Sequence, residues 1–202
     1  YEVRVGAGLL ERAATELAPF LRAGRPALVV TDETVAALYL APLRAALEAC
    51  GAQPHTFVVP PGEATKTLAW LGRLLEWALA RGVDRDTPLI ALGGGVVTDL
   101  AGLGASLLLR GVPFVALPTT LLAQVDASVG GKTGVDLAGQ KNAVGTFYQP
   151  VCVLADPVVL ATLPDVERQC GYAELLKMAL AFDAELFATL EQDGAAVLAA
   201  MP

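Results

Sequence analysis

The lysines are the first residues of this sequence whose type and spacing suggest chemistry. The chain has ten arginines but only four lysines: Lys66, Lys132, Lys141 and Lys177. A chain that uses arginine on its surface by default keeps lysine where a compact point charge is needed. Lys132 follows two glycines and Lys141 precedes Asn142. Backbone amides exposed beside an ammonium suit a phosphate or another oxyanion, so this stretch predicts an anion site, unless it is a solvated loop with incidental lysines.

A glycine-rich turn is the second candidate site. The residues Gly-Gly-Gly-Val-Val-Thr-Asp at 93–99 stand where a strand is expected to give way to a helix. Backbone amides at such a junction carry the positive end of the helix dipole, and glycine lets a diphosphate approach closely. The dinucleotide fingerprint GxGxxG is not met, because Thr98 stands at the third glycine position. The pattern indicates either a nucleotide diphosphate site or only a tight turn.

Three carboxylates lie at positions where they could hold a ligand. Asp32 follows an apolar run at 27–31 and could bind a ribose diol or cap the next helix. Glu63 flanks a helix start after Pro-Pro-Gly, where it could hold a nucleotide or merely be a first-turn charge. Asp126 could orient a substrate hydroxyl or cap the following turn. Each residue therefore has a structural interpretation beside its functional one.

Glu174 and Lys177 stand three residues apart in a segment expected to be helical, so they share one helix face. A surface ion pair is the ordinary interpretation, and a metal-ligating glutamate beside a lysine is the alternative. His55 is the single histidine, which excludes any site within this chain that needs two or three imidazoles. Arg110, which ends the glycine-rich helix, could add positive charge to an anion site.

These residues are positioned by an alternation of short apolar runs and longer helical patterns. The alternation predicts a parallel sheet with helices on both faces. Strands are expected at 2–5, 27–31, 56–59, 89–92, 114–117 and 151–155, and helices at 9–21, 33–50, 65–81, from the glycine turn to about 109, and from 157 onward. The stretch 130–150 has no clear period and is expected to be a long functional loop. The domains are placed at 1–155 and 156–202.

Composition excludes several classes of protein. Hydrophobic residues make up 54% of the 202 residues and charged residues 17%, so a sizeable core is expected rather than disorder. The net charge of −7 argues against sequence-independent nucleic-acid binding and against an acidic membrane surface. No apolar run reaches the roughly 18 residues of a membrane span. The odd number of cysteines, without CxxC spacing, favours free thiols in the cytoplasm.

Taken together, five stretches resemble the 3-dehydroquinate synthase family. They are the residues at 61–66 (Pro-Gly-Glu-Ala-Thr-Lys), 93–102, 118–133 (which ends Ser-Val-Gly-Gly-Lys-Thr), 139–150 (which begins Gly-Gln-Lys-Asn) and 171–177 (Gly-Tyr-Ala-Glu-Leu-Leu-Lys). The resemblance covers nearly the whole chain. Thr98 and Tyr172 depart from the family's usual glycine and aliphatic residue.

The resemblance implies an α/β fold in which an N-terminal Rossmann-like, parallel-sheet nucleotide-binding domain precedes the start of a mainly helical metal-binding domain. It implies a cytoplasmic, homodimeric lyase that uses NAD and a divalent metal, zinc or cobalt. The implied reaction converts a small sugar phosphate, 3-deoxy-D-arabino-heptulosonate 7-phosphate, to 3-dehydroquinate and phosphate in the shikimate pathway. No nucleic-acid or membrane partner is implied. The family's other two metal ligands are histidines of its C-terminal domain, most of which this sequence is expected to lack.

The resemblance also implies roles for single residues. Those matching the family's NAD contacts are Asp32, Glu63, Lys66, Gly94, Gly95, Asp99, Thr119, Thr120, Leu122, Lys132, Lys141, Thr162, Leu163 and Glu167. Those expected to act on the substrate or lie near it are Asp126, Lys132, Lys141, Asn142 and Lys177, with Arg110 reaching the substrate phosphate in the partner subunit. Glu174 would be the first metal ligand.

Three other functions stay open at this point. A different sugar-phosphate cyclase, of the inosose or valiolone synthase type, would share the NAD, the metal and most of the motifs. An enzyme similar to glycerol dehydrogenase would release NADH as a product. A module that binds NAD without catalysis is the third alternative for this stretch of chain.

Overall fold

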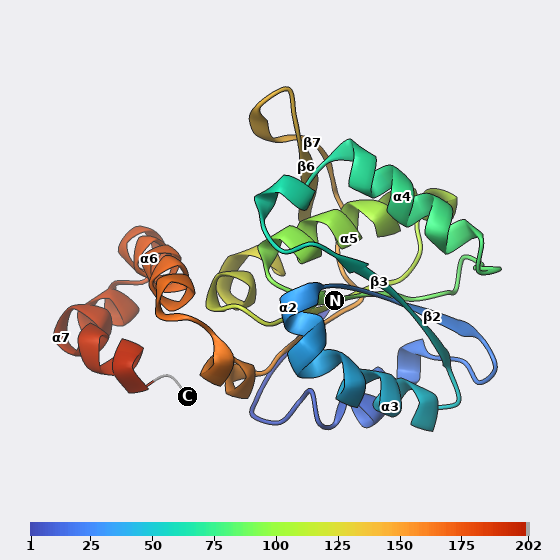
Figure 1. Ribbon diagram of the computed structural model, residues 1–202. Coiled ribbons are helices and arrows are strands. Elements are labelled where there is room, and N and C mark those ends of the chain that lie inside the picture. Colours follow the sequence, from blue (N-terminus) through green and yellow to red (C-terminus); the bar gives the residue numbers. More distant parts are fainter. Residues whose placement is uncertain (201–202) are drawn as a thin grey trace.

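The computed structural model describes residues 1–200, and a parallel sheet of six strands forms the centre of the fold (Figure 1). The strands run in the order β1-β8-β5-β4-β2-β3, and every neighbouring pair is parallel. They are β1 (Glu2–Val5), β2 (Pro26–Asp32), β3 (Gln53–Val59), β4 (Leu89–Gly93), β5 (Phe114–Pro118) and β8 (Cys152–Ala155). The predicted α/β fold is confirmed, and each predicted strand is present.

Continuous apolar runs explain why β4 and β5 lie in the middle of the sheet. Both strands are buried along their whole length, as expected for parallel strands whose two faces are covered. Side chains alternate between the two faces, so each face has its own apolar core. The helices that cover the two faces are α4 (Leu68–Leu79) and α5 (Gly95–Leu107) on one, and α1 (Ala13–Leu17) and α3 (Ala41–Ala49) on the other.

Two helices are more interrupted than predicted. In place of a helix over 9–21, α1 is followed at once by a 3-10 turn at Ala18–Phe20, whose second residue is Pro19. The helix expected at 33–50 is present as α2 (Glu33–Val35), a π-helical turn at Ala36–Leu40 and then α3. Pro42 stands near the start of α3, and because proline has no N–H the hydrogen-bond ladder changes there.

The prediction of an irregular loop at 130–150 is wrong. The segment forms an antiparallel hairpin of β6 (Lys132–Leu137) and β7 (Gln140–Phe147), which projects beside α5 (Figure 1). Ala138 and Gly139 connect the strands, and their φ angles of +52° and +78° correspond to a type I′ turn. Glycine allows the strands to approach closely, since a Cβ on Gly145 would meet the Thr133 carbonyl oxygen at 2.0 Å.

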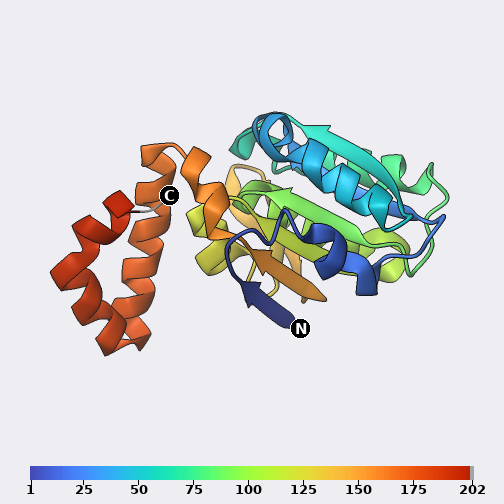
Figure 2. The same cartoon turned by 90° about the horizontal axis from the view of Figure 1, so that it is seen from below.

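Beyond β8 the chain is helical. A 3-10 segment at Pro157–Thr162 leads to α6 (Asp165–Phe182) and α7 (Ala184–Ala200), which pack on each other to one side of the sheet (Figures 1 and 2). The division into domains at 1–155 and 156–202 stays a prediction, and the final Met201 and Pro202 lie outside the described residues. Within residues 1–200, no helix combines the length and the apolar character that crossing a membrane requires.

Candidate active site

A cleft of about 630 Å³ lies where β2, β4 and β5 end and their connections to the following helices begin. In open parallel sheets, ligands bind at the carboxyl ends of the strands. All the residues that the sequence predicts to contact a dinucleotide, except Lys132, line this one cleft: Asp32, Glu63, Lys66, Gly94, Gly95, Asp99, Thr119, Thr120, Leu122, Lys141, Thr162, Leu163 and Glu167. Their binding roles stay predictions.

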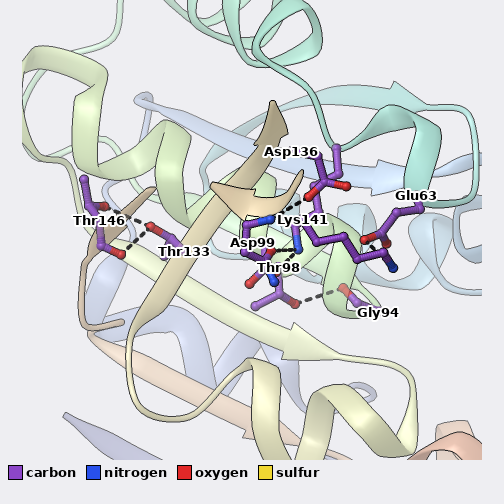
Figure 3. Close-up of polar contacts among 10 residues, drawn as sticks. Glu63, Gly94, Thr98, Asp99, Thr133, Asp136, Lys141 and Thr146 are labelled. Carbon is purple, nitrogen blue, oxygen red and sulfur yellow. Dashed lines mark hydrogen bonds and ion pairs between the residues drawn. The ribbon is translucent and has the colours of Figure 1, made fainter. Parts of the chain in front are cut away.

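The glycine turn leaves the N-terminus of α5 open to the cleft. Gly94 is the N-cap and brings no side chain, and a Cβ there would come within 2.9 Å of Thr120 Cγ2. Thr98, in the place of the third fingerprint glycine, is buried and donates a hydrogen bond to the Gly94 carbonyl oxygen at 3.1 Å (Figure 3). Its side chain therefore turns inward, and the first backbone amides of α5 remain available to an anion.

Asp32 both caps a helix and lines the cleft. Its Oδ1 accepts hydrogen bonds from the amides of Thr34 at 2.9 Å and Val35 at 3.0 Å, so the capping interpretation is confirmed. Its Oδ2 accepts no hydrogen bond from the part of the chain that the structure describes. One carboxylate can therefore cap α2 and still accept hydrogen bonds from a ligand.

Lys66 connects three elements at the base of the cleft. The side chain is only 5% exposed, and its Nζ lies 2.5 Å from Asp99 Oδ2 of α5. The same Nζ donates to Asn142 Oδ1 of β7. Burial raises the pKa of Asp99 above its ordinary value, and the hydrogen bond from Lys66 opposes that rise. Nearby, Lys141 forms a solvent-exposed ion pair with Glu63 at 3.2 Å (Figure 3).

A second cleft, of about 420 Å³, adjoins the first between the β6–β7 hairpin and the turn at Ala123–Ala127. Lys132 lies here and not in the first cleft. Asp99, Asp126 and Asn142 line both clefts. The residues predicted to act on the substrate thus meet the predicted nucleotide contacts along a shared wall.

Three predicted functional residues line neither cleft. Glu174 and Lys177 form an ion pair on α6, the ordinary interpretation of their spacing, and the carboxylate raises the pKa of Lys177. The Glu174 oxygen that Lys177 Nζ contacts is Oε1, which is buried. Arg110 is exposed at the far end of α5, roughly 20 Å from Gly95 by the helical rise per residue.

The structure also brings forward residues that sequence reasoning missed. Tyr39 lines the first cleft, and its hydroxyl lies 2.6 Å from Thr162 Oγ1. Asp136 accepts a hydrogen bond from the Asn142 amide at 2.8 Å (Figure 3). No local pattern marks this contact, because regular pairing from one end of the hairpin would place Asp136 opposite Ala143 and from the other end opposite Lys141, and only the register shift between Val135 and Leu137 brings Asp136 to Asn142. Among residues 1–200, no group of three or more His, Cys, Asp or Glu side chains is arranged to hold a metal ion.

Residues 56–170 match the family model described as 3-dehydroquinate synthase, N-terminal. The chain is 52% identical over 194 residues to a 3-dehydroquinate synthase of Cereibacter sphaeroides, covering 96% of this chain and 52% of that protein. It is 52% identical over 199 residues to that of Rhodospirillum rubrum, covering 98% of this chain and 51% of that protein. The chain thus spans about half the length of these relatives.

Several solved structures have a fold similar to that of this chain. One is 2-epi-5-epi-valiolone synthase from Streptomyces hygroscopicus with NAD+ and Zn2+ bound, at 41% identity and a TM-score of 0.89, covering 98% of this chain and 54% of that one. Another is 2-deoxy-scyllo-inosose synthase complexed with carbaglucose-6-phosphate, NAD+ and Co2+, at 30% identity and a TM-score of 0.79, covering 87% and 47%. Glycerol dehydrogenase from Schizosaccharomyces pombe, at 20% identity, shares the fold, with a TM-score of 0.71 over 88% of this chain and 42% of that one. By the match of its central 115 residues to the family model, this chain belongs to the 3-dehydroquinate synthase family.

Proposed function

We propose that this protein is a 3-dehydroquinate synthase, a lyase that converts 3-deoxy-D-arabino-heptulosonate 7-phosphate to 3-dehydroquinate and phosphate. The observation that carries the proposal is the shared wall of Asp99, Asp126 and Asn142 between two adjoining clefts. A dinucleotide in the first cleft and a sugar phosphate in the second would meet at these residues, as a hydride transfer requires. The higher identity to 3-dehydroquinate synthases (52%) than to the valiolone synthase (41%) supports this substrate.

The geometry of the first cleft fits NAD. The α5 N-terminus opens into it beside a glycine that brings no side chain, which suits a diphosphate. Thr119 Oγ1 is buried in the wall of the cleft and has no hydrogen-bond partner among the described residues, so it can bond to a ligand. Asp32 stands at the end of β2, where a carboxylate can accept from ribose hydroxyls. Bound there, NAD would supply the transient oxidation of a substrate alcohol and the later return of the hydride, so that no net NADH would accumulate.

The chain's own side chains bind and orient the substrate. Lys132 places an ammonium in the second cleft, where it attracts the phosphate of the substrate and stabilises the negative charge that develops as phosphate leaves. Asp126 can accept a hydrogen bond from a substrate hydroxyl and so fix the sugar ring. Lys66 holds Asn142 and Asp99 together at the wall between the clefts. Preorganised charges of this kind contribute most where water is excluded.

A divalent metal, zinc or cobalt, is part of the proposal, with Glu174 as a ligand. In its favour, Glu174 is a largely buried carboxylate, with 19% of its side chain exposed; its Oε1 is paired with Lys177 Nζ, so a metal would have to displace that ammonium or bind through Oε2. Against a complete site, residues 1–200 bring no second and third ligand to it.

The proposal includes a cytoplasmic homodimer in which Arg110 serves the partner's substrate site. Support comes from the position of Arg110, which is exposed and forms no ion pair within the described part of the chain. Because it lies at the far end of α5 from Gly95, it is distant from the first cleft of its own subunit, and it does not line the second. A neighbouring subunit that packed against this end of α5 would receive its guanidinium.

Phosphate release by the complete protein tests the proposal. The protein is given NAD, Zn2+ or Co2+, and 3-deoxy-D-arabino-heptulosonate 7-phosphate, with glucose 6-phosphate as the parallel substrate. We expect phosphate from the heptulosonate alone and no net NADH. Release from glucose 6-phosphate alone would replace the proposal with an inosose synthase, and accumulation of NADH would replace it with a dehydrogenase. Release from neither substrate would refute it.

A further inference from the structure

We infer that Asp136 is a positioning residue of the active site: its carboxylate holds a bulge of β7 in the conformation that directs Asn142 and Lys141 toward the clefts. The inference rests on the proposed function for its kinetic consequences. Its structural basis is independent, because it consists of hydrogen bonds within this chain. Asp136 touches neither cleft and is not itself a catalytic residue.

The hairpin changes register at Asp136. Val135 pairs with Val144, whereas Leu137 pairs with Gln140, so the single residue Asp136 faces the three residues 141–143 on β7. Such bulges bend a strand and re-aim its side chains, and they occur frequently beside active sites. Lys141 and Asn142, the two residues of the hairpin that line the first cleft, both lie in this bulge. The bulge thus decides where their side chains point.

The bulge contains a residue in an unfavourable conformation. Asn142 has a φ of +54°, in the left-handed region, where asparagine is tolerated better than most residues but still needs support from its surroundings. The carboxylate of Asp136 supplies that support, because its Oδ1 accepts a hydrogen bond from the Asn142 amide at 2.8 Å. No ladder partner is available for this amide, since the register shift has removed it.

Three residues close a ring of hydrogen bonds around this point. The Asp136 backbone amide donates to the Lys66 carbonyl oxygen at 2.8 Å, which fixes the hairpin to the segment just before α4. The Asp136 side chain holds the Asn142 backbone, and the Asn142 side chain accepts from the Lys66 ammonium. Each residue therefore positions the next, and Lys66 is held by backbone and side chain together. Removing the Asp136 carboxylate opens the ring at the bond that holds the bulge.

Two substitutions of Asp136 distinguish the effect of its hydrogen-bond acceptor from the effect of its negative charge. Asp136→Ala removes both, whereas Asp136→Asn keeps an oxygen that can accept from the Asn142 amide and removes only the charge. Gln140→Ala is the matched control, since Gln140 lies in the same hairpin, is exposed, and has no side-chain hydrogen bond to any residue in the range 1–200. The complete protein is used for every variant.

The first measurement is amide hydrogen exchange without substrate. In Asp136→Ala we expect the Asn142 amide to exchange about tenfold faster or more, as the loss of a hydrogen bond to a charged acceptor implies. The Thr133 and Val135 amides of the same hairpin should keep their rates. Asp136→Asn and Gln140→Ala should retain slow exchange at Asn142. Unchanged exchange at Asn142 in Asp136→Ala would overturn the inference, whatever reaction the protein catalyses.

The second measurement is steady-state kinetics, normalised to the number of NAD-binding sites so that unfolded protein does not count. In Asp136→Ala we expect kcat per site to fall by about 10- to 100-fold, because a small displacement of positioned groups is costly. Asp136→Asn should recover most of the rate. Full activity per site in Asp136→Ala, or equal impairment in Asp136→Asn, would overturn the positioning role. If the unmodified protein releases no phosphate, the proposed function fails, and the exchange experiment alone decides the role of Asp136.

Discussion

The ammonium of Lys66 and the carboxylate of Asp99 are in contact at 2.5 Å, with 5% and 17% of their side chains exposed. Few ionisable groups are buried to this extent without a partner, because desolvation of a charge is unfavourable. The pair joins the segment before α4 to α5 directly beneath the first cleft. Its two members stabilise each other only as long as both are present.

Removal of the Lys66 charge should therefore destabilise the protein. We expect Lys66→Met to lower the free energy of unfolding by about 3 kcal/mol at neutral pH, since a buried carboxylate is left uncompensated. Burial already raises the pKa of Asp99, so the folded variant binds a proton at a pH at which the unfolded chain does not. Stability should thus be regained as the pH falls toward that raised pKa. Urea unfolding at neutral and mildly acidic pH measures both effects.

The double variant Lys66→Met/Asp99→Asn is the control for that experiment. It removes the charge that the single variant leaves buried, so it should be more stable than Lys66→Met at neutral pH. It should also lose the dependence on mild acid. A loss of stability in Lys66→Met that is the same at both pH values would show that packing, and not the charge of Asp99, is responsible.

Lys132 offers a test of the division into two clefts. Because it lines the second cleft alone, Lys132→Ala should reduce phosphate release by two orders of magnitude or more, while the affinity for NAD changes little. Phosphate release and titration with NAD measure the two properties separately. Lys132→Arg, which keeps the charge in a different shape, is the matched control. Unchanged phosphate release in Lys132→Ala would remove Lys132 from the substrate site.

Asp156 should be one of the most important side chains for stability outside the clefts. It is 5% exposed and accepts hydrogen bonds from the amides of Gly8, Leu10 and Val158 at 3.0–3.1 Å. Asp156→Ala should lower the free energy of unfolding by about 3 kcal/mol, because one buried and two partly buried amides lose a charged acceptor. Asp156→Asn keeps one acceptor oxygen and should lose less. Urea denaturation midpoints, compared at equal slopes of the unfolding free energy against urea concentration, would establish the order of stability: unmodified protein, Asp156→Asn, Asp156→Ala.

A substitution in the turn of the β6–β7 hairpin should increase the stability of the protein. Ala138 occupies the left-handed region at φ +52°, which costs a residue with a Cβ about 1 kcal/mol or more. Asparagine followed by glycine is the preferred pair for a type I′ turn. We expect Ala138→Asn to raise the melting temperature, and Ala138→Val, which is β-branched, to lower it. The opposite order would exclude the turn type assigned here.

The cysteines should differ in reactivity according to their burial. Cys170 is exposed, Cys50 is half-buried and Cys152 is fully buried, where burial raises the pKa of its thiol. A thiol reagent should label Cys170 first and Cys152 only on unfolding, as mass spectrometry can show. Because the folded chain keeps the Cys152 proton at a pH where the unfolded chain loses it, stability should fall as the pH rises above about 9. Rapid labelling of Cys152 in the native protein would contradict its burial.

Local patterns predicted the sheet because its strands are continuous apolar runs between helical segments. The hairpin was missed for a physical reason. Gly134 and Gly145 face each other across its strands, so the close approach that stabilises it depends on residues that lack the apolar alternation of a strand. The glycine turn at α5 was predicted, but the inward rotation of Thr98 depends on a hydrogen bond that only the folded helix provides.

The candidate site, like the fold, could be predicted from the sequence only in part. Residues next to strand ends, such as Asp32 and Thr119, could be expected near one another because parallel strands end at one edge of the sheet. Lys66 reaches the same cleft through a tertiary contact with Asp99, thirty-three residues away, which no local pattern encodes. Asp136 depends on the register of β6 against β7. The roles of Lys177, Glu174 and Arg110 were predicted from the family resemblance, and none of the three lines either cleft.

Because the two clefts share a wall, we expect the occupancy of one to affect the affinity of the other. Asn142 belongs to both, and the hairpin that carries it is joined to α4 and α5 through Lys66. A ligand that shifts the equilibrium position of this wall in one cleft changes the affinity of the other, and linkage requires the effect to be reciprocal and equal in size. A dinucleotide that ordered the wall would thus favour entry of the second ligand, and the second ligand would favour the dinucleotide by the same factor, so the two sites would fill cooperatively.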